Sequence, residues 1–301
     1  MPTPAATTLG LQALTRPSGA FAMLALDQRE ALRVMFHQYR QRPIPDEELT
    51  EFKITTTRML SPHASGVLLD RQFALDRAID DRAVAPGCGL IAAADHFVPG
   101  EEEFVADARI DEDVDPAHYR ARGAVAMKLL VIYRPDGDPR ERIAMVERFV
   151  ERCHSAGLVS IIEPVSRAPH AGGSWDWTAG ILAAARELGA LGADLYKAEV
   201  PLAGQGDSGD IRRHCATITA SVTSPWVVLS TGVQPDAFPE AVELACREGA
   251  SGFLAGRAVW RTSIAHPDLE RALREEALPR LRHLSEVADS AVASRTKGSK
   301  G

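Results

Sequence analysis

The sequence contains few cysteines and no motif that groups them. Its 301 residues include four, Cys88, Cys153, Cys215 and Cys246, without a CxxC spacing. This pattern argues against a disulfide framework and is typical of free thiols in a reducing compartment. The first residues also lack the charged-then-apolar pattern of a secretion signal. We therefore expect a cytoplasmic protein.

Long hydrophobic runs and an excess of positive charge are also absent. No apolar run reaches the ~18 residues that a membrane span needs, so we expect no membrane partner. The net charge of -7 argues against general nucleic-acid binding. An anionic small molecule stays open, because a site can be locally basic. The composition, 45% hydrophobic and 25% charged, is that of a soluble globular protein.

The common nucleotide and metal motifs are missing as well. No GxGxxG follows the first apolar run, which argues against the runner-up fold, an open doubly wound sheet. Nine histidines are present, but they form no HExxH and no closely spaced pair. Asp95-His96 is the best candidate ligand set, and zinc-dependent catalysis is the less favoured chemistry. We expect neither a metal nor a cofactor.

Short apolar runs alternate with amphipathic stretches along nearly the whole chain. The runs are residues 21–27, 66–70, 89–96, 124–133, 158–165, 194–200, 226–232 and 252–257. Near-continuous apolar strands indicate a parallel sheet covered on both faces. Amphipathic stretches, the predicted helices, lie between these runs at residues 46–60, 139–156, 178–191 and 237–248. Eight strand–helix units over about 250 residues predict an α/β fold, the (β/α)8 or TIM barrel.

Nothing in the composition marks a second domain. We expect residues 1–290 to form the barrel, with 1–19 leading into it and a closing helix over 268–288, just after Pro267. Residues 291–301 are polar and basic, and we expect a disordered tail there.

The most unusual segment is DLYKAEVP, residues 194–201. It places Lys197 inside a short apolar strand, with Glu199 two residues later. Burial disfavours the ammonium form of lysine, and proteins that keep such a lysine often use its amine as a nucleophile. The alternative is a strand-end lysine that reaches water or pairs with Glu199.

Other polar residues fall at the carboxyl ends of the predicted strands, where this fold places its chemistry. They include Asp27, Lys128 and Glu163. Singly, each has a plain alternative: a helix cap, an ion pair at the barrel bottom, and a carboxylate facing water. Because alternate strands contribute to one interior layer, Lys128 is expected near Lys197, where its charge would lower the pKa of the Lys197 amine.

Two glycine-containing loops follow the last two strands, the usual phosphate site of this fold. They read Ser230-Thr231-Gly232 and Ala255-Gly256-Arg257. Glycine allows close backbone approach to an anion, and arginine offers a planar fork for phosphate. The alternative is a pair of ordinary glycine turns. The long loops at residues 166–175 and 202–209 are candidates for closing over a ligand.

With these residues in view, the chain resembles the class I, lysine-dependent aldolases of the tagatose-bisphosphate aldolase type, and among them the sulfofructosephosphate aldolases. The matching stretches span about residues 18–285 in order. They are residues 19–31, 128–131, 157–165, 192–197, 226–230 and 249–260. Two positions depart from the family pattern. The chain has Ser166 where we expect a more apolar residue, and Thr231 where we expect a serine.

The resemblance implies that Lys197 forms a Schiff base. It also implies the reaction of sulfoglycolysis, in which 6-deoxy-6-sulfofructose 1-phosphate gives dihydroxyacetone phosphate and 3-sulfolactaldehyde. The partner would be this phosphorylated sulfosugar, and the protein would be a homo-oligomer, a tetramer or a dimer. Tagatose or fructose bisphosphate cleavage and a sugar-phosphate-sensing barrel without turnover are the rival functions.

Within that mechanism, Glu163 is the first choice for the base and Asp27 the second. Lys128 would tune Lys197 and bind substrate oxygens, while Asp27 and Gln28 would orient hydroxyl groups. One anionic end would lie against Ser230, Thr231, Gly232, Gly256 and Arg257. The candidates for the sulfonate are Arg29, Arg134 and the loop after the last strand.

Overall fold

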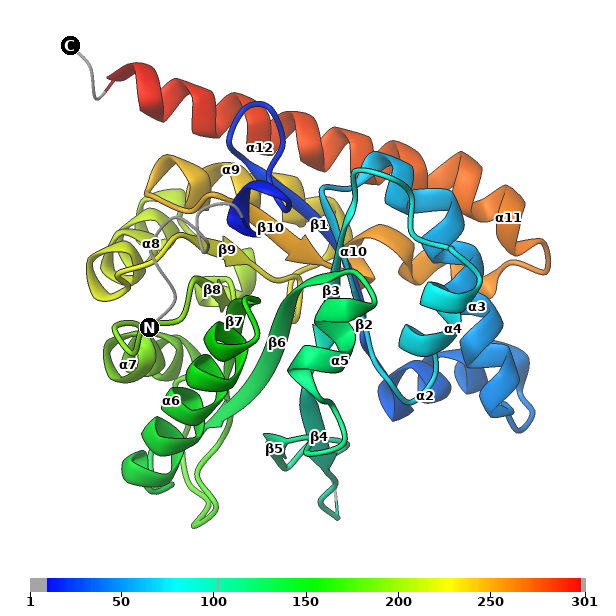
Figure 1. Ribbon diagram of the computed structural model, residues 1–301. Coiled ribbons are helices and arrows are strands. Elements are labelled where there is room, and N and C mark those ends of the chain that lie inside the picture. Colours follow the sequence, from blue (N-terminus) through cyan, green and yellow to red (C-terminus); the bar gives the residue numbers. More distant parts are fainter. Residues whose placement is uncertain (1–9, 102, 299–301) are drawn as a thin grey trace.

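Eight parallel strands close into a ring within the part of the chain that the computed structural model describes, residues 10–101 and 103–298 (Figure 1). This single domain confirms the predicted TIM barrel. In ring order the strands are β1 (Phe21–Leu26), β10 (Gly252–Ala255), β9 (Trp226–Val228), β8 (Leu195–Ala198), β7 (Val159–Ser166), β6 (Ala124–Tyr133), β3 (Gly89–Ala93) and β2 (Gly66–Leu69).

The strands form where the apolar runs predict them because both faces of the ring are covered. All six residues of β1 are buried, and alternate ones point inward. Met23, Ile161 and Leu195 belong to the inner cluster, together with Leu14 from the segment before β1. A Cβ atom on Gly89 would lie 2.6 Å from Leu14 Cδ2, so this glycine makes room for the side chain that enters the ring.

Helices follow the strands and cover the ring, and the four helices predicted between strands are confirmed within three residues at each end. Their bounds are α2 (Glu30–Arg40), α3 (Asp46–Leu60), α4 (Leu75–Asp80), α5 (Pro116–Ala121), α6 (Pro139–Ser155), α7 (Trp177–Leu188), α8 (Ser208–Ser221), α9 (Phe238–Arg247) and α10 (Arg257–Trp260). Aspartates cap α5, α6, α7 and α8 by accepting hydrogen bonds from backbone N–H groups in the first turn.

An antiparallel hairpin interrupts the repeat after β3. The predicted strand at 89–96 ends at Ala93, and β4 (Asp95–Val98) then pairs with β5 (Asp107–Ile110). Phe97 and Val105 of this excursion pack against residues near the ends of β6 and β7. The hairpin therefore lies beside the carboxyl ends of the strands, at the bottom of Figure 1.

The chain closes with α11 (Leu269–Ala272), a π turn (Leu273–Ala277) and α12 (Leu278–Gly298). The expected tail at 291–301 is wrong as far as Gly298, because apolar residues continue at helical spacing and Ala291 and Val292 are buried. The Arg295 guanidinium donates hydrogen bonds to the Cys246 carbonyl near the end of α9 and to the Ala250 carbonyl beyond it. Residues 1–9 of the N-terminal segment and 299–301 of the tail lie outside the described residues.

Within the described ranges, the helices are too short or too polar to cross a lipid bilayer.

Candidate active site

A cavity of about 520 Å³ opens at the carboxyl ends of the barrel strands. The residues after β1, the β4–β5 hairpin, β6, β7 and the loops after β9 and β10 line it. Of the sequence-predicted site residues, the lining includes Asp27, Gln28, Lys128, Glu163, Thr231 and Arg257. These polar residues, which come from the ends of different strands, therefore line the same cavity.

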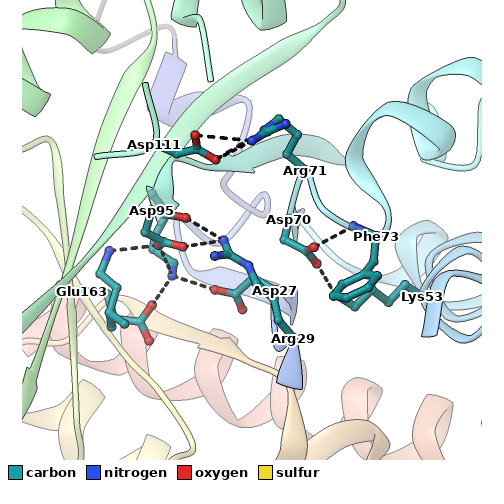
Figure 2. A network of polar contacts seen from close by, with 11 residues as sticks. Asp27, Arg29, Lys53, Asp70, Arg71, Phe73, Asp95, Asp111 and Glu163 are labelled. Atoms are coloured by element: carbon teal, nitrogen blue, oxygen red, sulfur yellow. Dashed lines mark hydrogen bonds and ion pairs between the residues drawn. The ribbon is translucent and has the colours of Figure 1, made fainter. Parts of the chain in front are cut away.

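Lys128 lies among three carboxylates at the base of this cavity. Its Nζ is 2.6 Å from Asp27 Oδ2, 2.8 Å from Asp95 Oδ2 and 2.9 Å from Glu163 Oε2. Figure 2 shows these carboxylates, from three different parts of the ring, turned toward one another. A buried ammonium group needs such partners to offset its lost hydration. Lys128 is thus at the catalytic end of the barrel and not in an ion pair at its bottom.

The charges in this cluster determine the protonation state of Lys128. Burial alone would lower the pKa of Lys128, but Asp27, Asp95 and Glu163 outweigh it and raise that pKa well above its usual value. Lys128 is therefore charged, yet three opposing carboxylates surround that charge. Its predicted effect on the Lys197 amine stays a prediction.

Asp27 shows the reverse balance. Burial alone would raise the pKa of Asp27, but the Lys128 and Lys197 ammonium groups outweigh it and hold the pKa well below its usual value. Asp27 therefore stays ionised at neutral pH and fits an orienting role better than proton transfer.

Lys197 is buried on β8, with its Nζ 2.9 Å from Glu163 Oε1. The two oxygens of Glu163 are thus shared between Lys197 and Lys128. Lys197 neither reaches water nor pairs with Glu199, so both plain alternatives are wrong. It contacts the cavity through Glu163 and is not itself among the lining residues.

Asp95 is a member of the cluster that the sequence suggested only as a metal ligand. It is fully buried, and it accepts hydrogen bonds from Lys128, the Leu130 N–H and Arg29. The Arg29 guanidinium also lies 3.9 Å from the ring centre of Phe97. The available signal was a carboxylate directly after an apolar strand, the same pattern that marked Asp27. In the part of the chain that the structure describes, no group of three or more His, Cys, Asp or Glu side chains is placed to hold a metal ion.

The two glycine loops meet beside the cavity. Arg257 donates to the Thr231 hydroxyl, and the Ala258 N–H donates to Ser230 Oγ at 3.4 Å. Both glycines have packing reasons of their own. A Cβ on Gly256 would lie 2.4 Å from the Ala25 carbonyl oxygen, and one on Gly232 would lie 2.4 Å from the Trp177 ring. Ser230, Gly232 and Gly256 stand next to the lining residues Thr231 and Arg257.

The arginines around the cavity differ in how their charge is used. Arg29 is paired with Asp95. Arg134, a sulfonate candidate from the sequence, does not line this cavity, because it is bound to the Glu103 carboxylate and the Ala168 carbonyl. Arg167, which we did not predict, lines it from the end of β7. Among the described residues, Arg167 and Arg257 form hydrogen bonds to neutral oxygens and no ion pair.

The model of the DeoC/LacD family of aldolases matches residues 21–262, a range that holds all of these side chains. The chain belongs to this family. It is an enzyme of the class I aldolase family, a carbon–carbon lyase. The aldolase is 27% identical over 285 residues to tagatose 1,6-diphosphate aldolase of Listeria monocytogenes, covering 85% of this chain and 81% of the relative. It is 26% identical to tagatose 1,6-diphosphate aldolase 2 of Streptococcus mutans, covering 82% of each chain.

Solved structures show the same fold. The aldolase superposes on a fructose-bisphosphate aldolase from Slackia heliotrinireducens with a TM-score of 0.70 at 18% identity, covering 98% of this chain and 91% of that one. An archaeal fructose 1,6-bisphosphate aldolase gives a TM-score of 0.64 at 17% identity, with 94% and 99% covered.

Proposed function

We propose that the aldolase cleaves 6-deoxy-6-sulfofructose 1-phosphate into dihydroxyacetone phosphate and 3-sulfolactaldehyde through an iminium ion at Lys197. The observation that carries the proposal is the contact between Lys197 Nζ and Glu163 Oε1, at 2.9 Å, beside a cavity lined by unpaired arginines. One solved structure with this fold, at 16% identity, is described as a Schiff base forming fructose-1,6-bisphosphate aldolase.

The first half of the reaction needs a neutral amine at Lys197. Glu163 is in direct contact with the Lys197 ammonium group and accepts its proton. The freed lone pair attacks the C2 ketone to give a carbinolamine. Glu163 then gives its proton to the departing hydroxyl group, so that water leaves, the iminium ion forms and Glu163 is ionised again. Lys128 stays charged among its carboxylates and keeps Glu163 oriented toward Lys197.

The second half breaks the C3–C4 bond. Glu163 takes the proton of the C4 hydroxyl, the bond electrons move into the iminium to form an enamine, and the aldehyde leaves. Protonation of the enamine at C3 and hydrolysis then release dihydroxyacetone phosphate and restore Lys197. Glu163 suits this base role better than Asp27, because Glu163 contacts Lys197 directly and the lowered pKa of Asp27 makes Asp27 a weak base.

The two ends of the substrate fit two separate cations. Arg257 and the loops after β9 and β10 are suited to the phosphate at C1. Arg167 directly follows β7, which is two strands away from β9 and three away from β10 around the ring. It is a single unpaired cation, because neighbouring Arg29 is neutralised by Asp95. One cation matches the single charge of a sulfonate better than the double charge of a phosphate.

Tagatose 1,6-bisphosphate is the second candidate substrate, because the relatives above are named for it. The distinction is made by kcat/KM for both substrates under identical conditions. A ratio of at least about tenfold in favour of the sulfosugar is expected, and the reverse ratio would assign the bisphosphate.

The iminium is tested by borohydride trapping with dihydroxyacetone phosphate, followed by peptide mass spectrometry. The expected adduct is on Lys197 and is lost in Lys197→Met. Lys53 and Lys128 are also buried and serve as internal controls. An adduct on either of them, or no adduct, would refute the mechanism.

A further inference from the structure

Glu199 is a buried carboxyl group that the mechanism above does not use. It follows Lys197 by two residues, and its side chain is 1% exposed. Its Oε2 accepts hydrogen bonds from the Ser166 N–H at 2.7 Å and from the Trp177 indole at 3.0 Å. Among the described residues, its buried Oε1 has no hydrogen-bond partner.

This asymmetry indicates the protonation state. A neutral acid has one carbonyl oxygen, which suits two N–H donors, and one hydroxyl oxygen. An ionised carboxylate would leave a charged oxygen buried without a partner, which costs far more than a neutral one. Consistently, burial raises the pKa of Glu199 to about 7, although Trp177, Ser166 and Arg167 act in the opposite direction.

Glu199 holds both ends of one loop. Ser166 is the last residue of β7, and Trp177 is the first residue of α7. A second bond joins the same two residues, from Ser166 Oγ to the Trp177 carbonyl at 3.1 Å. The segment between them, residues 167–176, is therefore closed at its base by the strand that carries Lys197.

Arg167 is the first residue of that segment, and its backbone N–H donates to the Tyr133 carbonyl at 2.9 Å. We propose that Glu199 is a positioning residue, which fixes the β7–α7 segment through Ser166 and Trp177 and thereby places Arg167 to hold the anionic group at C6 of the substrate. This assignment rests on the proposed function for the ligand of Arg167. It extends that function to a residue that contacts neither the substrate nor Lys197.

The charged groups that act on Glu199 come from β7 and the residue after it. Arg167 and Glu163 belong to the β7 side, where Arg167 favours the ionised form of Glu199 and Glu163 opposes it. Tyr196 lies on β8, the strand that precedes Glu199, and burial raises its pKa far above the physiological range, so Tyr196 stays neutral. Ionisation of Glu199 above about pH 7 would leave its buried Oε1 charged and loosen the segment.

Two variants test the proposal. Glu199→Gln keeps an oxygen acceptor but does not titrate, whereas Glu199→Leu keeps the size and removes the acceptor. The measured quantities are KM and kcat for the ketose that the wild type cleaves, and the half-saturating concentration of dihydroxyacetone phosphate in borohydride trapping, since this triose has no C6 end.

Glu199→Leu should raise KM for the ketose about tenfold, with less than a twofold change in triose trapping. Glu199→Gln should have the wild-type KM at pH 6. It should lack the rise in KM that we expect of the wild type above pH 7. In an Arg167→Gln background, Glu199→Leu should add little, because both changes act through one contact.

Three results would overturn the proposal: equal effects of Glu199→Leu on ketose and triose, full additivity with Arg167→Gln, or a Glu199→Gln pH profile like that of the wild type. The pH profile needs only the Glu199→Gln variant, so this test can still be made if Glu199→Leu does not fold. Absence of a wild-type adduct would instead refute the proposed function, so the two failures are distinguishable.

Discussion

At the residue scale, the use of lysine is unusual. The sequence has only five lysines, and the three at positions 53, 128 and 197 are buried. Lys53 forms an ion pair with Asp70, apart from the active-site cluster in Figure 2. Lys128 contacts three carboxylates. Among the described residues, Lys197 forms one ion pair, with Glu163. Arginine cannot give up its proton in a protein, so lysine is retained where a neutral amine is required. Lys53 and Lys128 have partners suited to a permanent charge.

Glu163→Gln should reduce kcat by about 10²–10⁴, the usual contribution of a positioned acid–base group, with a smaller effect on KM. Glu187→Gln is a matched control, because Glu187 pairs with Arg142 outside the cavity. Steady-state kinetics of both variants give the comparison. Equal losses in the two variants would contradict the role of Glu163.

Lys128→Met should lower the free energy of unfolding by about 3–5 kcal/mol at pH 7, because it leaves three buried carboxylates without their shared cation. Without that cation the folded-state pKa of Asp27 rises, so protonation at lower pH should recover part of the loss. In the wild type the sign is opposite, since the lowered pKa of Asp27 contributes stability that disappears as the pH falls through it. Urea unfolding between about pH 2 and pH 8 measures both trends, because the wild-type loss falls below the usual aspartate pKa. A loss that does not depend on pH would contradict the account.

At the element scale, the loops do more to define the site than the strands. The hairpin β4–β5 supplies Asp95 at its first residue and one wall of the cavity. The segment after β7 supplies Arg167, and the turn after β9 contains Gly232 at a φ of 80°. Each of these is fixed by contacts between elements that are distant in the sequence.

Gly232→Ala should destabilise the fold by about 3 kcal/mol or more, because it adds a collision with Trp177 to the strain of a positive φ. Gly123→Ala isolates the strain alone, since Gly123 has a φ of 100° and open space at the Cβ position. Its expected cost is about 1 kcal/mol. Thermal unfolding and tryptophan fluorescence measure the difference, and equal costs would show that Trp177 yields freely.

The sequence predicted strand and helix positions well, because apolar runs and aspartate caps are local signals. It missed the hairpin, whose strands are only four residues long and therefore too short to carry a clear periodic signal. Arg134 follows the predicted strand that carries Lys128 and was one of the candidates for the sulfonate. It lies past the end of β6 and is held instead by the hairpin and the β7–α7 segment. The carboxylates that contact Lys128 come from β7, from the residue after β1 and from the hairpin, so no local sequence pattern identifies them.

At the scale of the whole molecule, the barrel is closed by contacts between its two ends. Strand β1 pairs with β10, and α12 packs along α9 and β1. In Figure 1, α12 lies at the top, opposite the hairpin. The last turns of α12 are thus part of the fold, although their sequence is polar and basic.

Truncation after Ser290 should cost about 3 kcal/mol of stability, because it exposes the surface under Val292 and removes the bonds that Arg295 donates to Cys246 and Ala250. Ser294→Ala, an exposed position in the same turn, should change stability by less than about 0.5 kcal/mol. Urea unfolding compares the two. A truncated protein as stable as the full chain would show that these turns contribute nothing.

The lysine–carboxylate cluster also has a consequence for the order of folding events. Lys128 belongs to β6, Glu163 to β7, and Asp27 follows β1, whose partner β10 lies more than 200 residues away in the chain. Such distant pairings form late, because loop closure must precede the contacts that reward it. We therefore expect the active site to form late, when the ring closes. A nascent chain or folding intermediate with most of its helices in place has no aligned nucleophile, and reactive sugars meet the amine only in the finished molecule.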